Sequence, residues 1–177
     1  MTTGIVCGSA ATVWNDLANL PKYARHAPRM LINDAIYVVP WGQYAFSNHI
    51  DWLENYLDRR QLYKFDEVEV HAVSKPKRDQ AEHMFVDKWW RIGPYGFYSS
   101  AMAGAWIMWR LGYRLIIFCG CPMGGDHIDG HVSEFQPWAD EIGKSRMLEK
   151  RKLVGAEIRS MSGWTREQFG TPEEAEG

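Results

Sequence analysis

Small polar residues stand directly after several short apolar runs of this sequence, where they could bind a nucleotide. The first run is followed by a loop of small residues, of which Ser9 and Thr12 are polar and Gly8 and Ala10 contribute their backbone N–H groups. Their backbone N–H groups and the helix start behind them could bind a phosphate. The loop is neither a G-x-G-x-x-G fingerprint nor a Walker loop, because the later glycines and the lysine of those motifs are missing. A tight strand-to-helix turn is therefore the alternative interpretation.

Similar groups stand at the ends of later runs and at one helix start. They are Asn33 and Asp34, Ser47 and Asn48, and Ser99 and Ser100. Amide and hydroxyl side chains suit the ribose, base edge and phosphates of a nucleotide, because they fix its orientation without adding charge. Each one alone is also a common cap or turn residue. Their recurrence favours a shared binding site.

The loop "GGDHIDGH" carries four ionisable side chains: Asp126, His127, Asp129 and His131. A histidine titrates near neutral pH, so His127 or His131 could act as a general base or acid. The carboxylates Asp126 and Asp129 could instead hold a divalent metal together with a phosphate. A polar surface loop without a catalytic role is the third interpretation.

The segment "RSMSGWT" follows the last apolar run and could close the same site from another side. Ser160, Ser162 and Gly163 would lie at this edge, and Trp164 could stack on a nucleotide base. The alternative is that Trp164 packs the C-terminal segment onto the sheet.

The elements that must position these residues alternate between strand and helix. Short apolar runs predict strands at 3–8, 29–34, 43–48, 66–74, 113–120 and 156–162. Apolar spacing of three and four predicts helices at 12–20, 51–63, 99–112 and, for the most part, 132–155. This alternation predicts an α/β fold, a single Rossmann-like domain over residues 1–170 with a mainly parallel sheet flanked by helices. In such folds ligands bind beyond the carboxyl ends of the strands, where the strand order reverses.

Three segments are expected to depart from this regular pattern. In "DEVEVHAVS", Glu67, Glu69 and His71 alternate with apolar residues, which predicts one wetter face and a strand near a sheet edge. Residues 75–98 are expected to form a loop or a lid-like insertion. The acidic residues 171–177 are expected to be disordered.

Composition limits the class of partner. The 177 residues carry a formal net charge of −2, which gives no electrostatic reason to expect nucleic acid as the main partner. Three cysteines form no framework of the secreted type, and no apolar run reaches membrane-spanning length. We therefore expect a cytoplasmic protein with a small-molecule ligand, and the sequence leaves open whether it forms a homo-oligomer.

Four stretches, in order, resemble a known superfamily: "IVCGSAATV", "MLINDA", "YAFSNHIDW" and "YSSAMAGAWIMWRLGYRLIIFCGCPM". They are similar to the Rossmann-like bacterial family 42 sialyltransferases and to the related 6-hydroxymethylpterin diphosphokinases. The last stretch is the most specific, because a helix of small residues, Leu-Gly-Tyr, a strand and Gly120 follow one another in the same way.

The resemblance implies a nucleotide site. Residues 8–13 correspond to a Gly-Asn-Gly-Pro-Ser-Leu loop, and Asn33 and Asn48 match asparagines at the second and third strand ends. Ser99 and Ser100 match the start of a helix that meets the nucleotide's sugar and phosphate. Ser9 and Ala10 depart from the loop pattern, so the phosphate cradle is altered, and Pro122 stands where relatives often have an aspartate.

The resemblance implies a glycosyltransferase of the sialyltransferase type that uses a cytidine-nucleotide-activated sugar. His127 or His131 would then be the general base, and no metal would be required. The alternative is a diphosphokinase of the hydroxymethylpterin type, which uses ATP and Mg²⁺ and needs carboxylates such as Asp34, Asp126 and Asp129. A third interpretation is a non-catalytic module that binds a nucleotide or a protein partner.

Overall fold

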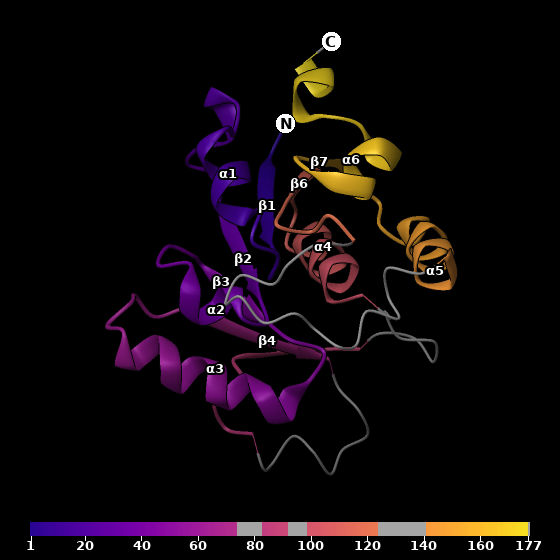
Figure 1. The fold of residues 1–177 in the computed structure, drawn as a ribbon. Coiled ribbons are helices and arrows are strands. Elements are labelled where there is room, and N and C mark those ends of the chain that lie inside the picture. The colour runs from indigo at the N-terminus through magenta and orange to yellow at the C-terminus, as the bar shows by residue number, and fades with distance from the viewer. Residues whose placement is uncertain (74–82, 92–98, 124–140, 177) are drawn as a thin grey trace.

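The computed structural model places seven strands in one sheet with the order β5-β4-β3-β2-β1-β6-β7 (Figure 1). It describes residues 1–73, 83–91, 99–123 and 141–176. Every pair of neighbouring strands is parallel. The strands are β1 (Thr3–Cys7), β2 (Arg29–Ile32), β3 (Tyr44–Phe46), β4 (Glu69–Val73), β5 (Lys88–Trp90), β6 (Leu115–Cys119) and β7 (Glu157–Ser160). The expected α/β fold with a parallel sheet is confirmed.

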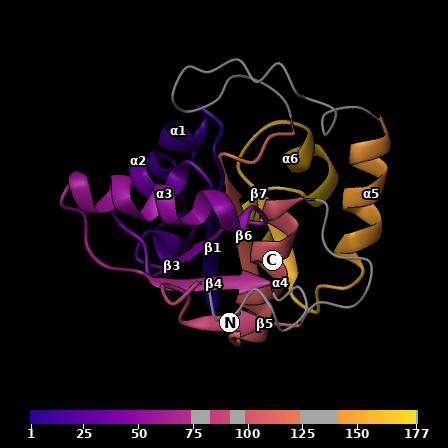
Figure 2. The same cartoon turned by 90° about the horizontal axis from the view of Figure 1, so that it is seen from below.

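Helices cover both faces of the sheet (Figures 1 and 2). One face is covered by α1 (Val13–Ala18), α2 (Ala35–Val38) and α3 (Ile50–Leu62). The other is covered by α4 (Ser100–Arg110), α5 (Glu141–Arg151) and α6 (Gly163–Phe169). Alternate residues of each strand supply the two cores: in β1, Val6 faces one and Ile5 the other. None of the helices described is long and apolar enough to cross a membrane.

Helix α4 packs closely against the sheet because it carries small residues. A Cβ atom added at Gly104 would lie 2.7 Å from Cδ1 of Ile32, so a larger residue would push the helix away from β2. The helix ends near the amino end of β1, where the Thr2 hydroxyl donates to the carbonyl of Gly112 over 2.9 Å. Since the helix ends at that edge of the sheet, its first residues lie toward the carboxyl edge.

Two expected irregular segments contain regular structure. Within residues 75–98, β5 pairs with β4, His71 lying opposite Lys88, and forms the edge of the sheet. The prediction of a loop throughout this segment was therefore wrong for residues 88–90, and the rest of the lid hypothesis falls largely outside the described residues. The acidic tail, expected to be disordered, contains a 3₁₀ helix, Pro172–Glu176, anchored by a hydrogen bond from the Tyr23 hydroxyl to the Pro172 carbonyl over 2.9 Å.

His71 does not lie on a wet face. Glu69 is exposed as expected, but the His71 side chain is fully buried. The reason is β5, whose Trp90 ring stacks on the imidazole at 5.9 Å between centroids. The alternation in β4 correctly predicted a strand near the sheet edge, but it was wrong about the exposure of His71, because the strand that covers this side chain was not expected.

Candidate functional site

The strand order reverses between β1 and β6, inside the sheet. From β1 the chain builds β2 to β5 outward on one side, and it then returns to add β6 and β7 on the other. Gly8 follows β1 and Gly120 follows β6, so both glycines stand at the carboxyl edge of the sheet, at this reversal. This is the position where open α/β sheets bind ligands.

The loops after β1 and β6 are hydrogen-bonded to each other. The N–H of Gly8 donates to the Cys119 carbonyl over 2.8 Å, and that of Ala10 donates to the Gly120 carbonyl over 3.1 Å. A Cβ atom added at Gly8 would lie 2.4 Å from the Gly120 carbonyl oxygen, so this approach requires glycine. Two of the four N–H groups expected to cradle a phosphate, those of Gly8 and Ala10, thus hold the loops together.

Asp16 ties these loops to the end of β7. Its Oδ2 accepts hydrogen bonds from the Gly120 N–H over 2.8 Å and from the Ser162 hydroxyl over 2.7 Å. Because the Ser162 hydroxyl hydrogen points to Asp16, the 3.2 Å contact between the Thr12 and Ser162 hydroxyls is a hydrogen bond donated by Thr12. Hydrogen bonds among Thr12, Ser162, Asp16 and Gly120 thus join the segments after β1, β6 and β7.

Asp16 was not among the predicted site residues, although the sequence carries a signal for it. It lies three residues after Val13 and four before Leu20, on the apolar side of the helix, and its side chain is 1% exposed. Its Oδ1 is buried and has no hydrogen-bond partner in the part of the chain that the structure describes. A carboxylate on an apolar helix face is rarely buried without a specific partner, and here the partners are Gly120 and Ser162.

Asn33 and Ser47 meet at the ends of β2 and β3. Asn33 has a left-handed backbone, with φ of 53°, and its Oδ1 accepts a hydrogen bond from the Ser47 hydroxyl over 2.8 Å. This bond orients the amide, so the Nδ2 hydrogens of Asn33 are its donors toward a ligand. The Ser9 hydroxyl donates to the Ile32 carbonyl over 3.1 Å, which fixes the first loop against the end of β2. Asn48, two residues after β3, lies at the same edge.

The start of α4 contributes the hydroxyls of Ser99 and Ser100. The Ser99 oxygen caps the helix by accepting from the N–H of Met102 over 3.4 Å, as the sequence predicted. The cap uses the oxygen of Ser99 as an acceptor, so its hydroxyl hydrogen can still be donated. Together with the Asn33 amide, these serines supply neutral hydrogen-bond donors at the carboxyl edge.

Other candidate residues have simpler roles or lie outside the described part of the chain. His127, His131, Asp126 and Asp129 are in the segment 124–140, which is not described. Asp34 accepts a hydrogen bond from the Tyr37 hydroxyl over 3.0 Å. Trp164 packs against the core cluster beside α4, which agrees with the packing interpretation. Among the described residues, no three histidine, cysteine or acidic side chains gather as a metal site.

The three cysteines are buried free thiols beside the reversal. Burial raises the pKa of Cys7 to about 12, and burial likewise raises the pKa of Cys119 and of Cys121. A thiol in this state is not a nucleophile at neutral pH. We therefore assign these residues to packing.

No protein-family model matches the sequence, and no curated protein matches it. Several solved structures do. The sialyltransferase CstII from Campylobacter jejuni, in complex with the substrate analogue CMP-3FNeuAc, has a TM-score of 0.63 and 12% identity, over 97% of this chain and 86% of that chain. The α-2,3-sialyltransferase from Campylobacter jejuni in apo form has a TM-score of 0.57 and 15% identity, over 97% of this chain and 79% of that chain. These values show a sialyltransferase-like fold. They do not support the resemblance to the 6-hydroxymethylpterin diphosphokinases.

Proposed function

We propose that this chain is a nucleotide-binding transferase, a glycosyltransferase that takes its sugar from a cytidine nucleotide. The observation that carries the proposal is that the loops after β1 and β6 are hydrogen-bonded to each other at the reversal of the strand order, while Ser9 of the first loop bonds to the end of β2, just before Asn33. The likeness to CstII, solved in complex with CMP and a trisaccharide acceptor, supports the cytidine nucleotide.

The residues at the carboxyl edge divide into two groups under this proposal. The Asn33 amide, Asn48 and the hydroxyls of Ser99 and Ser100 bind the nucleotide. The N–H groups of Gly8 and Ala10 and the hydroxyls of Thr12 and Ser162 hold the loops in place, because each already donates a hydrogen bond to another part of the protein. Donors that are oriented before the ligand arrives lose little freedom on binding and stabilise the charge that develops on the leaving phosphate.

In this proposal the base of the transfer step is His127 or His131, which lie outside the described residues. The acceptor hydroxyl oxygen forms a bond to the anomeric carbon while the bond from that carbon to the phosphate oxygen breaks. The hydroxyl proton goes to His127 or His131, and the bonding electrons leave with the cytidine monophosphate. The carboxylates Asp126 and Asp129 are not needed in this scheme, since protein donors stabilise the phosphate.

Nucleotide binding is tested first by thermal unfolding. We expect CMP or CDP to stabilise the fold without Mg²⁺, by about 2.7 kcal/mol at a concentration 100 times the dissociation constant. The same measurement is made with UDP, ADP and ATP, each with and without Mg²⁺. Stabilisation by ATP only with Mg²⁺ would contradict the proposal in favour of phosphoryl transfer, and no stabilisation by any nucleotide would contradict nucleotide binding.

A matched pair of variants shows whether the reversal is the binding site. Asn33→Gly removes the amide and still accepts the left-handed backbone, so CMP should stabilise this variant much less than the wild type. Asn55→Gly changes an exposed residue of α3 and should leave the CMP effect unchanged. Equal CMP effects in the two variants would place the nucleotide elsewhere.

The base is tested by replacing His127 and His131 together with alanine. We expect the release of CMP from CMP-sialic acid to fall by about 100-fold, because proton transfer by a positioned base contributes at least this factor. CMP should still raise the unfolding temperature, because neither histidine belongs to the nucleotide-binding group. Unchanged turnover in the double variant would exclude both histidines as the base.

A further inference from the structure

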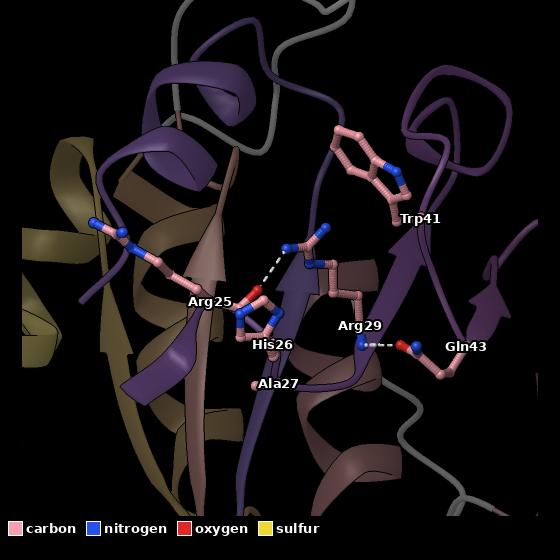
Figure 3. Close-up of a pocket in the computed structure, with 6 residues that line it drawn as sticks. All are labelled: Arg25, His26, Ala27, Arg29, Trp41 and Gln43. Carbon is pink, nitrogen blue, oxygen red and sulfur yellow. Dashed lines mark hydrogen bonds between the residues drawn. The ribbon is translucent and has the colours of Figure 1, made fainter. Parts of the chain in front are cut away.

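A hollow opens at the amino edge of the sheet, opposite the candidate nucleotide site. It has a volume of about 410 Å³ and is lined by Arg25, His26, Ala27, Arg29, Trp41 and Gln43 (Figure 3). Arg29 begins β2 and Asn33 follows it, so the two residues are separated along the strand by roughly 13 Å. The hollow is therefore distinct from the site proposed for the cytidine nucleotide.

Arg29 is held in a fixed position inside this hollow. Its backbone N–H donates to Oε1 of Gln43 over 2.8 Å, and its Nη2 donates to the Arg25 carbonyl over 3.0 Å. Figure 3 shows its guanidinium between the rings of His26 and Trp41, while the Arg25 guanidinium points away. The guanidinium carbon lies 5.6 Å from the centroid of the Trp41 ring.

No carboxylate among the described residues pairs with the charge of Arg29. In the described part of the chain, neither Arg25 nor Arg29 forms an ion pair, and no carboxylate lines the hollow. The Nε of Arg29 is buried and has no hydrogen-bond partner among the described residues. A half-buried guanidinium without an anion is unfavourable, and a bound oxyanion would remove that cost.

Trp41 adds a flat apolar surface beside this cation. Its side chain is 57% exposed, although a large aromatic ring gains most from burial. The imidazole of His26, also exposed, borders the guanidinium on the other side and can donate to the same anion. A ligand that pairs an oxyanion with a planar ring would satisfy Arg29 and cover Trp41 at once.

We propose that this hollow binds a phosphate monoester carried by a planar ring, with the phosphate on Arg29 and His26 and the ring on Trp41. A phosphate monoester fits better than a carboxylate, because its two charges and three outer oxygens can meet both donors together. The proposal does not depend on the nucleotide site at the carboxyl edge.

Phenyl phosphate is the probe, and its binding to the full chain is measured by calorimetry and by the tryptophan indole N–H signals in NMR. The Trp41 signal, identified by its loss in Trp41→Phe, should shift on titration. Arg29→Gln should weaken binding by about 10-fold, as expected for a charge-assisted hydrogen bond, and His26→Gln and Trp41→Ala by about 3-fold each. Inorganic phosphate should bind more weakly than phenyl phosphate. Asn33→Gly should have no effect.

Several results would overturn the proposal. Absence of binding, or binding unchanged in both His26→Gln and Trp41→Ala, would do so even if Arg29→Gln failed to fold, because those two side chains are exposed. Benzoate binding as tightly as phenyl phosphate would overturn the assignment of a phosphate. Loss of binding in Asn33→Gly would show that the probe binds at the carboxyl edge instead.

Discussion

Replacing Asp16 with alanine is expected to lower the free energy of unfolding by about 3 to 4 kcal/mol. The substitution removes the shared acceptor of the Gly120 N–H and the Ser162 hydroxyl. A buried donor left without an acceptor costs about 1–3 kcal/mol, and two donors are affected here. The smaller side chain also leaves a cavity under α1. The measurement is the midpoint and slope of urea denaturation.

Asparagine at position 16 is expected to behave differently. Its Oδ1 can take the place of the Asp16 Oδ2 and accept both hydrogen bonds, while its amide replaces the carboxylate oxygen that has no partner among the described residues. The buried charge of Asp16 also has no cationic partner there. The free energy of unfolding of Asp16→Asn should therefore lie within about 1 kcal/mol of the wild-type value, or above it.

Two comparisons make the Asp16 prediction specific. Asp58→Ala changes an exposed carboxylate on α3 and should stay within about 0.5 kcal/mol of the wild type. CMP binding should be weakened in Asp16→Ala and kept in Asp16→Asn, because only the first substitution releases the loops after β6 and β7. Equal destabilisation by alanine and asparagine would show that the two hydrogen bonds do not carry the effect.

The strands could be predicted because their signal is local. The runs at β1, β2 and β6 are buried on both faces, so nearly every residue is apolar and the run itself reveals the strand. The helix over residues 99–112 was likewise predicted from its local apolar spacing, and its Gly104 packs closely against Ile32.

The edge strand β5 could not be predicted in the same way. It is three residues long, and its Lys88 is exposed. Its strand conformation depends on pairing with β4, seventeen residues earlier at His71 and Lys88. Since the sequence near residue 88 contains no information about this partner, neither the strand nor the burial of His71 was expected.

The candidate site was predictable in position but not in detail. The carboxyl ends of parallel strands share one edge of the sheet, which explains why Gly8, Asn33 and Gly120 lie at the same edge; that they bind a nucleotide stays a prediction. The Asp16 hydrogen bonds join residues 104 and 146 positions apart in the sequence, and no local pattern specifies such pairs. Whether an N–H group is free for a phosphate depends on these long-range bonds.

The stability of the fold is expected to fall by about 3 kcal/mol as the pH decreases from 6.5 to 4, because of His71 alone. Burial, together with the charge of Lys88, lowers the pKa of His71 from 6.5 to about 4, although Asp87 opposes this shift. The unfolded chain therefore takes up a proton at a higher pH than the folded chain. The contribution of the neutral His71 imidazole to the free energy of unfolding is complete above pH 6.5. It is lost as the pH falls from 6.5 to 4, by about 1.4 kcal/mol for each unit of the pKa shift.

The hydrogen bond from Trp90 explains why protonation opposes folding. The indole N–H can only donate, so Nδ1 of His71, at 2.8 Å, must accept, and the neutral imidazole carries its hydrogen on Nε2. A second proton on Nδ1 would set two donors against each other and separate β5 from β4. Glu69 lies 3.1 Å from Nε2 but forms no hydrogen bond with it, and it is partly exposed, so it compensates weakly. The Tyr44 ring, edge-on to the imidazole, supplies no acceptor.

His71→Asn isolates this contribution, because the asparagine Oδ1 can accept from the Trp90 indole and does not titrate in this range. Urea denaturation between pH 7 and pH 4 should show a loss of stability that is about 3 kcal/mol smaller in this variant than in the wild type. His49→Asn removes an exposed histidine and should follow the wild-type profile. Parallel profiles for the wild type and His71→Asn would mean that the imidazole is not kept neutral by its burial. In that case the contact between β4 and β5 would not depend on which nitrogen of His71 carries the proton.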